Sequence, residues 1–217
     1  MKKLFLIAFI GFISISAFSQ EKNSTSLTSS KFNIGLSGGI GIYGGKTNDK
    51  SATNDSTAVD AACAIIKLHT DYSLFNKFTI GFVFERNGFL TNKDSSNSAS
   101  SLNIGITAKY KFINKEFNKL FIELMPAYSY FTYQNEENHQ KDKVESNGFN
   151  FQVGLGWDHY FGKHLGIYLG SYYTIYKYNK IVNADNGEPL LVNYPPEEFN
   201  IKLSGVNLLK LGLLYRF

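Results

Sequence analysis

Apolar side chains recur at every second position through most of this chain, and this alternation constrains the fold more than any other feature. It begins at Phe32, where Phe32, Ile34 and Leu36 are separated by Asn33 and Gly35. A period of two predicts a strand with one apolar and one small or polar face. Seven more segments repeat it, over 62–72, 78–84, 102–112, 120–130, 149–157, 165–175 and 199–217. The sequence therefore predicts an all-β fold of eight strands.

The segments between these strands alternate in length. Long polar connections are predicted at 44–57, 87–101, 134–147 and 179–198, and short ones at 73–77, 113–119 and 161–164. An even number of antiparallel strands with long loops at one end and short turns at the other is typical of a bacterial outer-membrane barrel. A soluble β-sandwich or a lipocalin-like barrel has a similar number of strands. The face that carries the charges decides between these classes.

The charged residues fall on the polar, Gly-rich face of the predicted strands. That face carries Lys67, Asp71, Glu85, Lys109, Lys111, Glu123, Asp158, Lys202, Lys210 and Arg216, whereas the apolar face carries only Arg86 and Lys177. A soluble barrel would turn its charged face to water, but small glycines suit a crowded interior. A Lys or Arg facing lipid at the midplane costs roughly 2–4 kcal/mol. The distribution predicts an eight-stranded antiparallel transmembrane up-and-down β-barrel with its charges inside.

Aromatic residues on the apolar face concentrate near the two ends of the strands. One group lies near the short turns and the other near the long loops: Phe78, Phe112, Trp157, Tyr215 and Phe217, and then Tyr128, Tyr130, Phe149 and Tyr173. Rings of this kind form girdles where a barrel meets the lipid headgroups. The outer-membrane lipid is therefore an expected partner.

The first thirty residues differ from the rest. Lys2 and Lys3 precede the apolar segment 4–15, and Ala17-Phe18-Ser19 has the small-x-small pattern of a cleavage site. This is typical of a secretory signal peptide, since a spanning helix needs about 20 apolar residues. We expect a signal peptide at 1–19, a polar periplasmic tether at 20–30 and the barrel domain at 31–217. The expected location is the outer membrane of a Gram-negative bacterium.

Other kinds of chemistry find little support. Without Lys2 and Lys3 the chain has 20 basic and 18 acidic residues, too even a balance for nucleic-acid binding. The four histidines share no short spacing, so no metal site is expected. The pattern Gly-x-Gly-x-x-Gly at 39–44 is followed by a loop and not by a helix, so no dinucleotide cofactor is expected. The sequence Asn186-Gly187 predicts a hairpin tip; the alternative, a calcium loop at 183–188, lacks most of its ligands.

Two pairs of opposite charges are predicted inside the barrel. With the second short turn centred on Glu116, Lys109 lies directly opposite Glu123, and with the first centred on Phe75, Lys67 is the diagonal neighbour of Glu85. Such neighbours are within side-chain reach, and a buried charge without a partner is costly. We expect these residues to form a structural plug of paired charges. The alternative is a gate whose rearrangement opens a narrow ion path.

Three segments carry a resemblance to a known family. The segments Phe32-Asn-Ile-Gly-Leu-Ser-Gly-Gly39, 101–112 (Ser-Leu-Asn-Ile-Gly-Ile-Thr-Ala-Lys-Tyr-Lys-Phe) and 211–217 (Leu-Gly-Leu-Leu-Tyr-Arg-Phe) resemble small outer-membrane barrels of the PorT-like, "porin family" group, with the OmpA/OmpX type of architecture. That group usually has Pro where this chain has Gly105. The alternation up to Tyr215 and Phe217 resembles the C-terminal signature read by the barrel-assembly machinery. The resemblance implies an eight-stranded barrel and transfers no catalytic residues.

These features together predict a non-enzymatic outer-membrane barrel with a structural or partner-interaction role. Side chains fill the interior of a barrel of this size, so an envelope protein partner would bind the loops at 44–57, 87–101, 134–147 and 179–198. The alternative functions are a narrow gated channel for ions or small solutes and, less favoured, a lipid-modifying enzyme. No cofactor is expected.

Overall fold

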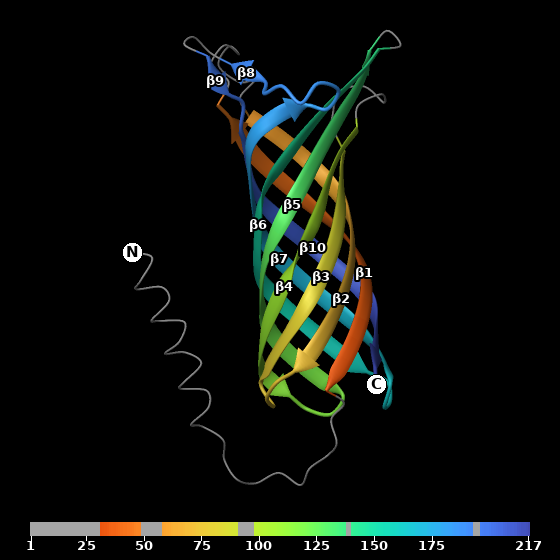
Figure 1. Cartoon of the computed structure of the whole chain (residues 1–217). Coiled ribbons are helices and arrows are strands. Elements are labelled where there is room, and N and C mark those ends of the chain that lie inside the picture. Colours follow the sequence, from red (N-terminus) through yellow and green to blue (C-terminus); the bar gives the residue numbers. More distant parts are fainter. Residues whose placement is uncertain (1–30, 49–57, 91–97, 138–139, 193–195) are drawn as a thin grey trace, which may run out of the picture.

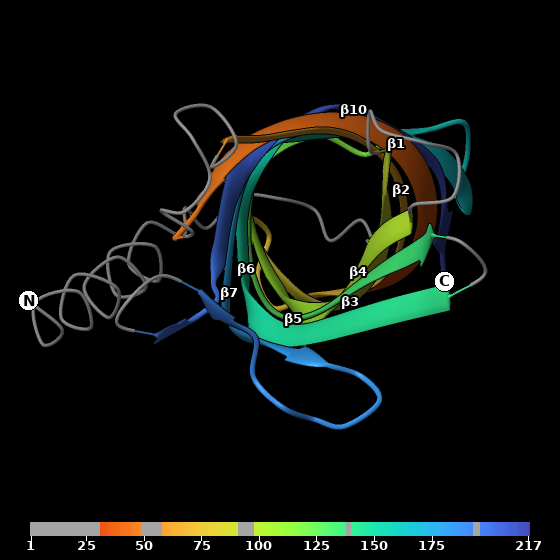
Figure 2. The ribbon, with the colours of Figure 1, turned by 90° about the horizontal axis from the view of Figure 1, so that it is seen from above.

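Eight long antiparallel strands close into a barrel (Figures 1 and 2). A computed structural model describes residues 31–48, 58–90, 98–137, 140–192 and 196–217, so the predicted signal peptide and tether lie outside the described residues. The wall consists of β1 (Phe32–Thr47), β2 (Ala58–Ser73), β3 (Phe78–Leu90), β4 (Ser98–Asn114), β5 (Asn118–Glu137), β6 (Gln140–Tyr160), β7 (Leu165–Asn183) and β10 (Ile201–Arg216). Each strand pairs with its neighbour in sequence, and β10 pairs with β1. The predicted fold class is confirmed.

The register of the strands makes the barrel narrow and tilted. A walk around the wall along paired residues starts at Leu36 and ends on the same strand at Lys46, ten residues further (46 − 36 = 10). Its steps are Leu36, Leu68, Phe84, Ile104, Tyr128, Phe149, Lys177, Lys202 and Lys46. In an eight-stranded barrel such an offset tilts the strands by about 40°, and the interior is just wide enough for side chains to fill.

The wall is apolar outside and charged inside, the reverse of a soluble barrel. Phe82 and Leu213 face outward with 72% and 70% of their surface exposed, whereas Lys67 and Glu85 face inward with 0% exposed. The aromatic rings predicted for the girdles, such as Phe149 (52%) and Phe217 (62%), face outward. In the described part of the chain no helix is long and apolar enough to cross a membrane. An outward apolar band around a charged interior is the arrangement of a barrel surrounded by lipid.

The strands continue well into the segments predicted as long loops. The predicted loop 134–147 is mostly a hairpin, in which β5 and β6 pair as far as Glu137 and Gln140. Strand residues also occupy parts of 44–57, 87–101 and 179–198. The loop boundaries predicted from hydrophobicity were therefore wrong. Beyond the lipid both faces of a strand meet water, so the apolar alternation stops while the backbone pairing goes on.

A β-bulge in β10 reverses the orientation of its first half. Ile40 pairs with Leu209 and Gly41 with Asn207, so Leu208 is an extra residue on β10. The sequence pattern placed Lys202 inside and Leu203 outside, but Lys202 is exposed and Leu203 is 5% exposed. That prediction was wrong because one extra residue moves every side chain beyond it to the other face.

A small structure fills the connection between β7 and β10. It contains β8 (Leu191–Val192), which pairs with β9 (Glu197–Glu198). It also contains the predicted hairpin tip, where the N–H of Gly187 donates to the carbonyl oxygen of Asn183 at 2.9 Å. Gly187 has a φ of 73°, a conformation that glycine adopts without strain. The hairpin prediction is confirmed.

Candidate functional site in the barrel interior

Two buried ion pairs cross the centre of the barrel. The Lys67 Nζ lies 2.8 Å from Glu123 Oε1, and the Lys210 Nζ lies 2.5 Å from Glu85 Oε2. All four side chains are 0% exposed. Lys67 is on β2 and Glu123 on β5, and Lys210 is on β10 and Glu85 on β3, so neither pair joins neighbouring strands. These bonds hold opposite sides of the wall together.

A third lysine has two carboxylates within reach. The Lys109 Nζ donates to Asp71 Oδ2 at 2.7 Å and lies 4.0 Å from Glu123 Oε2. Because Glu123 also binds Lys67, it links the two lysines. The ion pairs of β2, β4 and β5 therefore form one connected group.

Neutral side chains bind the remaining oxygens of the central carboxylates. The Tyr172 hydroxyl donates to Glu123 Oε2 at 2.5 Å. The Gln152 amide donates to Glu85 Oε1 at 2.7 Å, and its oxygen accepts from Lys210 at 2.9 Å. A buried ion pair is stable when further hydrogen bonds satisfy its other lone pairs and protons. Both central pairs meet that condition.

The predicted charge pairs are placed in register, but their side chains bind other partners. Lys109 lies directly opposite Glu123, as expected. Lys67 lies directly opposite Glu85 and not on the diagonal, because the turn is centred one residue later than predicted. Lys67 nevertheless binds Glu123, and Lys109 binds Asp71. Asp71 and Lys210 were on the predicted polar face but were not recognised as partners, because ladder spacing does not show which residues meet across the lumen.

Aromatic layers close the lumen above and below the ion pairs. Toward the long connections the buried cluster consists of Tyr43, Cys63, Ile65, Phe89, Ala99, Phe131, Tyr176, Tyr178 and Leu203. Toward the short turns it consists of Phe121, Tyr160, Tyr168, Tyr172 and Leu214. Sequence reasoning assigned aromatic rings to the lipid girdles and missed the four tyrosines on the inner face of β7. The sequence could have identified these tyrosines by their positions. They alternate with the outward residues of β7 and share a face with Gly166 and Gly170.

Lys111, Lys119 and Arg216 are buried cations near the short turns. Arg216 donates to the carbonyl oxygens of Lys163 (2.8 Å), Gly162 (3.1 Å) and Glu116 (3.1 Å), which belong to two different turns. Its guanidinium also lies 4.3 Å from the ring centre of Tyr160. Arg216 therefore ties the turns together at this end of the barrel.

A family comparison gives this architecture a name. The profile of the outer membrane protein beta-barrel domain matches residues 5–217. The chain belongs to this family. Its members are barrels of the Gram-negative outer membrane, so the apolar wall described above faces lipid, and the end with the short turns and the C-terminus is the periplasmic end (Figure 1).

Solved structures of other outer-membrane barrels resemble the chain in fold. The outer membrane protein AlkL, determined in lipid bilayers, is 14% identical, with 92% of this chain and 96% of AlkL covered and a TM-score of 0.51. OprG of Pseudomonas aeruginosa is 14% identical (87% and 97% covered, TM-score 0.47), and the protease OmpT of Escherichia coli is 10% identical (91% and 100%, 0.48). A search of curated proteins found no match. At these identities the likeness shows the fold alone.

The histidines of this family member have structural contacts. His159 Nδ1 lies 2.9 Å from Asn118 Oδ1, and His164 Nδ1 lies 2.8 Å from the carbonyl oxygen of Arg216. His69 is buried beside the ring of Tyr168, with centroids 5.6 Å apart. His139 lies outside the described residues. Among the residues that the structure describes, no three His, Cys, Asp or Glu side chains are grouped to hold a metal ion.

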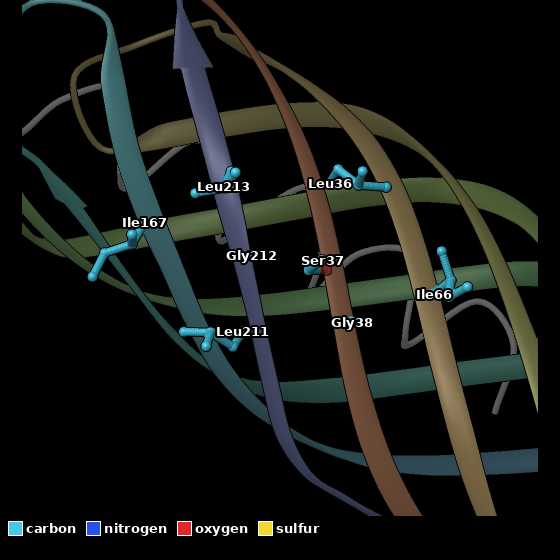
Figure 3. Close-up of a pocket in the computed structure, with 8 residues that line it drawn as sticks. All are labelled: Leu36, Ser37, Gly38, Ile66, Ile167, Leu211, Gly212 and Leu213. Atoms are coloured by element: carbon cyan, nitrogen blue, oxygen red, sulfur yellow. The ribbon is translucent and has the colours of Figure 1, made fainter.

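The outer wall carries a shallow groove of about 500 Å³ (Figure 3). Leu36, Leu211 and Leu213 border it, and Gly38 and Gly212 form part of its floor. Its lining residues belong to β1, β2, β7 and β10. Its apolar lining is suited to acyl chains.

The predicted assembly residues lie on the same outer wall at its periplasmic edge. The rings of Tyr215 and Phe217 are 4.9 Å apart, and Phe217 lies 5.3 Å from Phe32 across the β1–β10 seam. The N–H of Phe217 donates to the carbonyl oxygen of Phe32 at 3.2 Å. These contacts join the first strand, β1, to the last strand, β10. The role of Tyr215 and Phe217 as an assembly signal stays a prediction.

Proposed function

We propose that this protein is a closed, non-enzymatic outer-membrane barrel that presents its extracellular strands to a partner in the cell envelope. The filled lumen carries this proposal. Lys67, Glu85, Glu123 and Lys210 are 0% exposed, and an aromatic layer lies on each side of them. A lumen filled by side chains is a poor path for solutes. Interaction must then use the outer surface.

The hairpin formed by the upper parts of β5 and β6 is the proposed contact surface. It continues beyond Tyr130, the last outward aromatic residue on β5, to Glu137, and Figure 1 shows it rising above the ends of β2 and β3. The Lys143 ammonium lies 2.6 Å from Glu145 Oε1 and lowers the pKa of that carboxyl from its ordinary value. Continuous pairing makes this hairpin a stiffer surface than a loop.

Single-channel recording in planar bilayers tests the closed state. We expect the wild-type barrel to show no stable conductance steps at neutral pH. Regular open steps from correctly folded protein would contradict the proposal. Folding is verified independently by the shift in gel mobility between unheated and heated samples.

Site-specific photo-crosslinking in living cells tests the contact surface. A crosslinking residue at exposed Lys143 should capture one defined envelope protein, whereas the same residue at exposed Lys77, in a periplasmic turn, should not. Equal capture of the same protein at both positions would contradict the assignment of the partner surface to the extracellular hairpin.

A gated ion path is the second candidate, and the position of Lys109 favours it. This ammonium lies 2.7 Å from Asp71 and 4.0 Å from Glu123, so a small movement exchanges its partners. Such an exchange would loosen the Lys67–Glu123 pair. Conductance that is absent in the wild type and appears in Glu123→Gln would support the gate. Silent recordings from a folded Glu123→Gln barrel would exclude it.

We propose no catalytic role. The resemblance to OmpT, which is named a protease, is one of fold, and His159 and His164 are engaged with Asn118 and Arg216. Phospholipid and lipopolysaccharide vesicles incubated with the purified barrel should therefore yield no new lipid products. Deacylated products that form in proportion to barrel concentration would overturn this part of the proposal.

A further inference from the structure

Three lysines form a row on the outer wall of the barrel. Lys46 of β1 pairs with Lys202 of β10, and Lys202 pairs with Lys177 of β7. All three side chains are exposed on the outward face. Directly opposed residues have Cβ atoms about 4.5–5.5 Å apart. The three ammonium groups therefore belong to one patch roughly 10 Å across, which we call the lysine row.

The lysine row lies at the level of the outer headgroups. Lys46 is 14 residues along β1 from Phe32 (46 − 32 = 14), whose ring packs against Phe217 at the periplasmic edge. A strand tilted by about 40° rises roughly 35 Å over that length. The apolar band of such barrels is only about 25 Å tall. The upper edge of this apolar band is marked by Phe149, an outward ring that pairs with Lys177 on the neighbouring strand.

The β10 bulge builds this row. Without the extra residue Leu208, Lys202 would face the lumen and Leu203 would take its place outside. Bulges commonly re-aim a side chain in this way. The result places like charges directly opposite each other, an arrangement that is unfavourable unless an anion lies between them.

The chain itself supplies no such anion in the part that the structure describes. Two other exposed lysines have carboxylate partners, with Lys143 2.6 Å from Glu145 and Lys180 3.7 Å from Glu198. Within the described ranges, Lys46, Lys177 and Lys202 form no ion pair. The outward residues just above the apolar band on β4, β5 and β6 are neutral: Ser100, Thr132 and Asn147. Arg86 of β3 is a further exposed cation of the outer wall, but its ladder neighbours, Ile66 and Leu102, are neutral. The lysine row differs from it because three cations lie side by side.

We propose that the lysine row binds the phosphate of a phosphorylated lipid headgroup in the outer leaflet. Lysine is a common phosphate ligand, and its flexible stem lets the ammonium reach the headgroup level from an apolar wall. Directly below the row the same strands expose Ile42 (55%), Ile175 (44%) and Tyr173 (47%). A lipid covers both parts, charge above and acyl chains below, whereas a soluble acidic partner would cover only the charge. This inference concerns the outer wall and is independent of the proposed closed lumen.

Native mass spectrometry of the folded protein in zwitterionic micelles provides the test. The probe is diphosphorylated lipid A, compared with the same glycolipid after both phosphates are removed. We expect wild-type barrel to bind the phosphorylated form at least tenfold more tightly, with an affinity that falls as salt rises. Equal affinity for the two forms would overturn the proposal, as would competition by inorganic phosphate at concentrations equal to those of the lipid.

A triple variant locates the site. Substitution of Lys46, Lys177 and Lys202 by Ser should weaken binding of the phosphorylated lipid at least tenfold. The matched control replaces Lys77, Lys115 and Lys163, three exposed lysines of the periplasmic turns, by Ser and should change the affinity less than twofold. Unchanged binding by the folded triple variant, or equal losses in both variants, would overturn the assignment. The wild-type comparison above remains decisive if the triple variant fails to fold.

Discussion

The centre of the lumen and its periplasmic end hold buried charge in different ways. At the centre, Lys67 and Lys210 each bind a carboxylate from a distant strand. At the periplasmic end, Lys111 donates to the Ser73 hydroxyl at 3.0 Å, Lys119 lies 4.9 Å from the ring centre of Tyr160, and Arg216 donates to turn carbonyls. In the described residues none of these last three cations forms an ion pair within 4.0 Å.

The difference follows from access to water and to free backbone groups. Aromatic layers shut the centre off from both ends, so a cation there needs an opposite charge. At the periplasmic mouth the turns offer carbonyl oxygens that no strand uses, and bulk water is near. Among the described residues, six buried Lys and Arg side chains can therefore coexist with four buried Asp and Glu side chains.

Removal of one central charge should have the largest effect on stability. In Glu85→Gln the Lys210 ammonium loses its partner, and breaking a buried pair costs about 3–5 kcal/mol. Urea unfolding in lipid vesicles measures the loss. The exposed Glu188 is the control, since Glu188→Gln should leave the midpoint unchanged. A loss below about 1 kcal/mol for Glu85→Gln would mean that water reaches the centre.

Removal of the Arg216 guanidinium at the periplasmic end should lower stability less than removal of a central charge. Arg216→Gln gives up three charged hydrogen bonds to turn carbonyls, but water can replace part of them, so we expect about 2 kcal/mol. Arg216→Lys should recover little, because one ammonium cannot replace the planar fork that reaches both turns. Full recovery by Lys would show that charge alone matters at this end.

An added methyl group at the boundary between the two regions should have a smaller effect. In Gly156→Ala the added Cβ would overlap the ring of Phe121, and the Lys109 ammonium lies 4.9 Å from the centre of that ring. Overpacking of this kind costs about 1 kcal/mol or somewhat more. Gly88→Ala is the control, because nothing lies within 4 Å of its Cβ. Equal unfolding midpoints for the two variants would contradict a tightly filled interior.

Loss of an aromatic ring at the β1–β10 seam should have the smallest effect on stability, and it should also lower the yield of assembled barrel. Phe217→Ala removes ring contacts with Phe32 and Tyr215, worth about 1 kcal/mol. If Phe217 is also part of the assembly signal, the yield of inserted barrel should fall below that of Phe151→Ala. Quantitative heat-modifiability gels of outer membranes give the two yields. Equal yields would remove the assembly role.

The wall of this barrel could be predicted from sequence, and its interior only in part. Alternation placed Lys67, Glu85, Lys109 and Glu123 inside because lipid penalises charge on the outer face. It failed at Lys202, where a single extra residue, Leu208, reverses the faces without altering the composition. Alternation could not predict which charged side chains bind each other. The lumen is so narrow that a residue across the barrel is as close as a ladder neighbour.

A pair of double-mutant cycles tests most directly whether ion pairs across the lumen hold this barrel closed. One cycle combines Lys67→Met with Glu123→Gln, whose groups lie 2.8 Å apart across the lumen, and the other combines Lys67→Met with Glu85→Gln, its neighbour on the ladder. Unfolding free energies should give a coupling of about 2–3 kcal/mol for the first cycle and roughly 1 kcal/mol or less for the second. An equal or larger coupling in the second cycle would show that the charges pair along the wall, and would contradict the account.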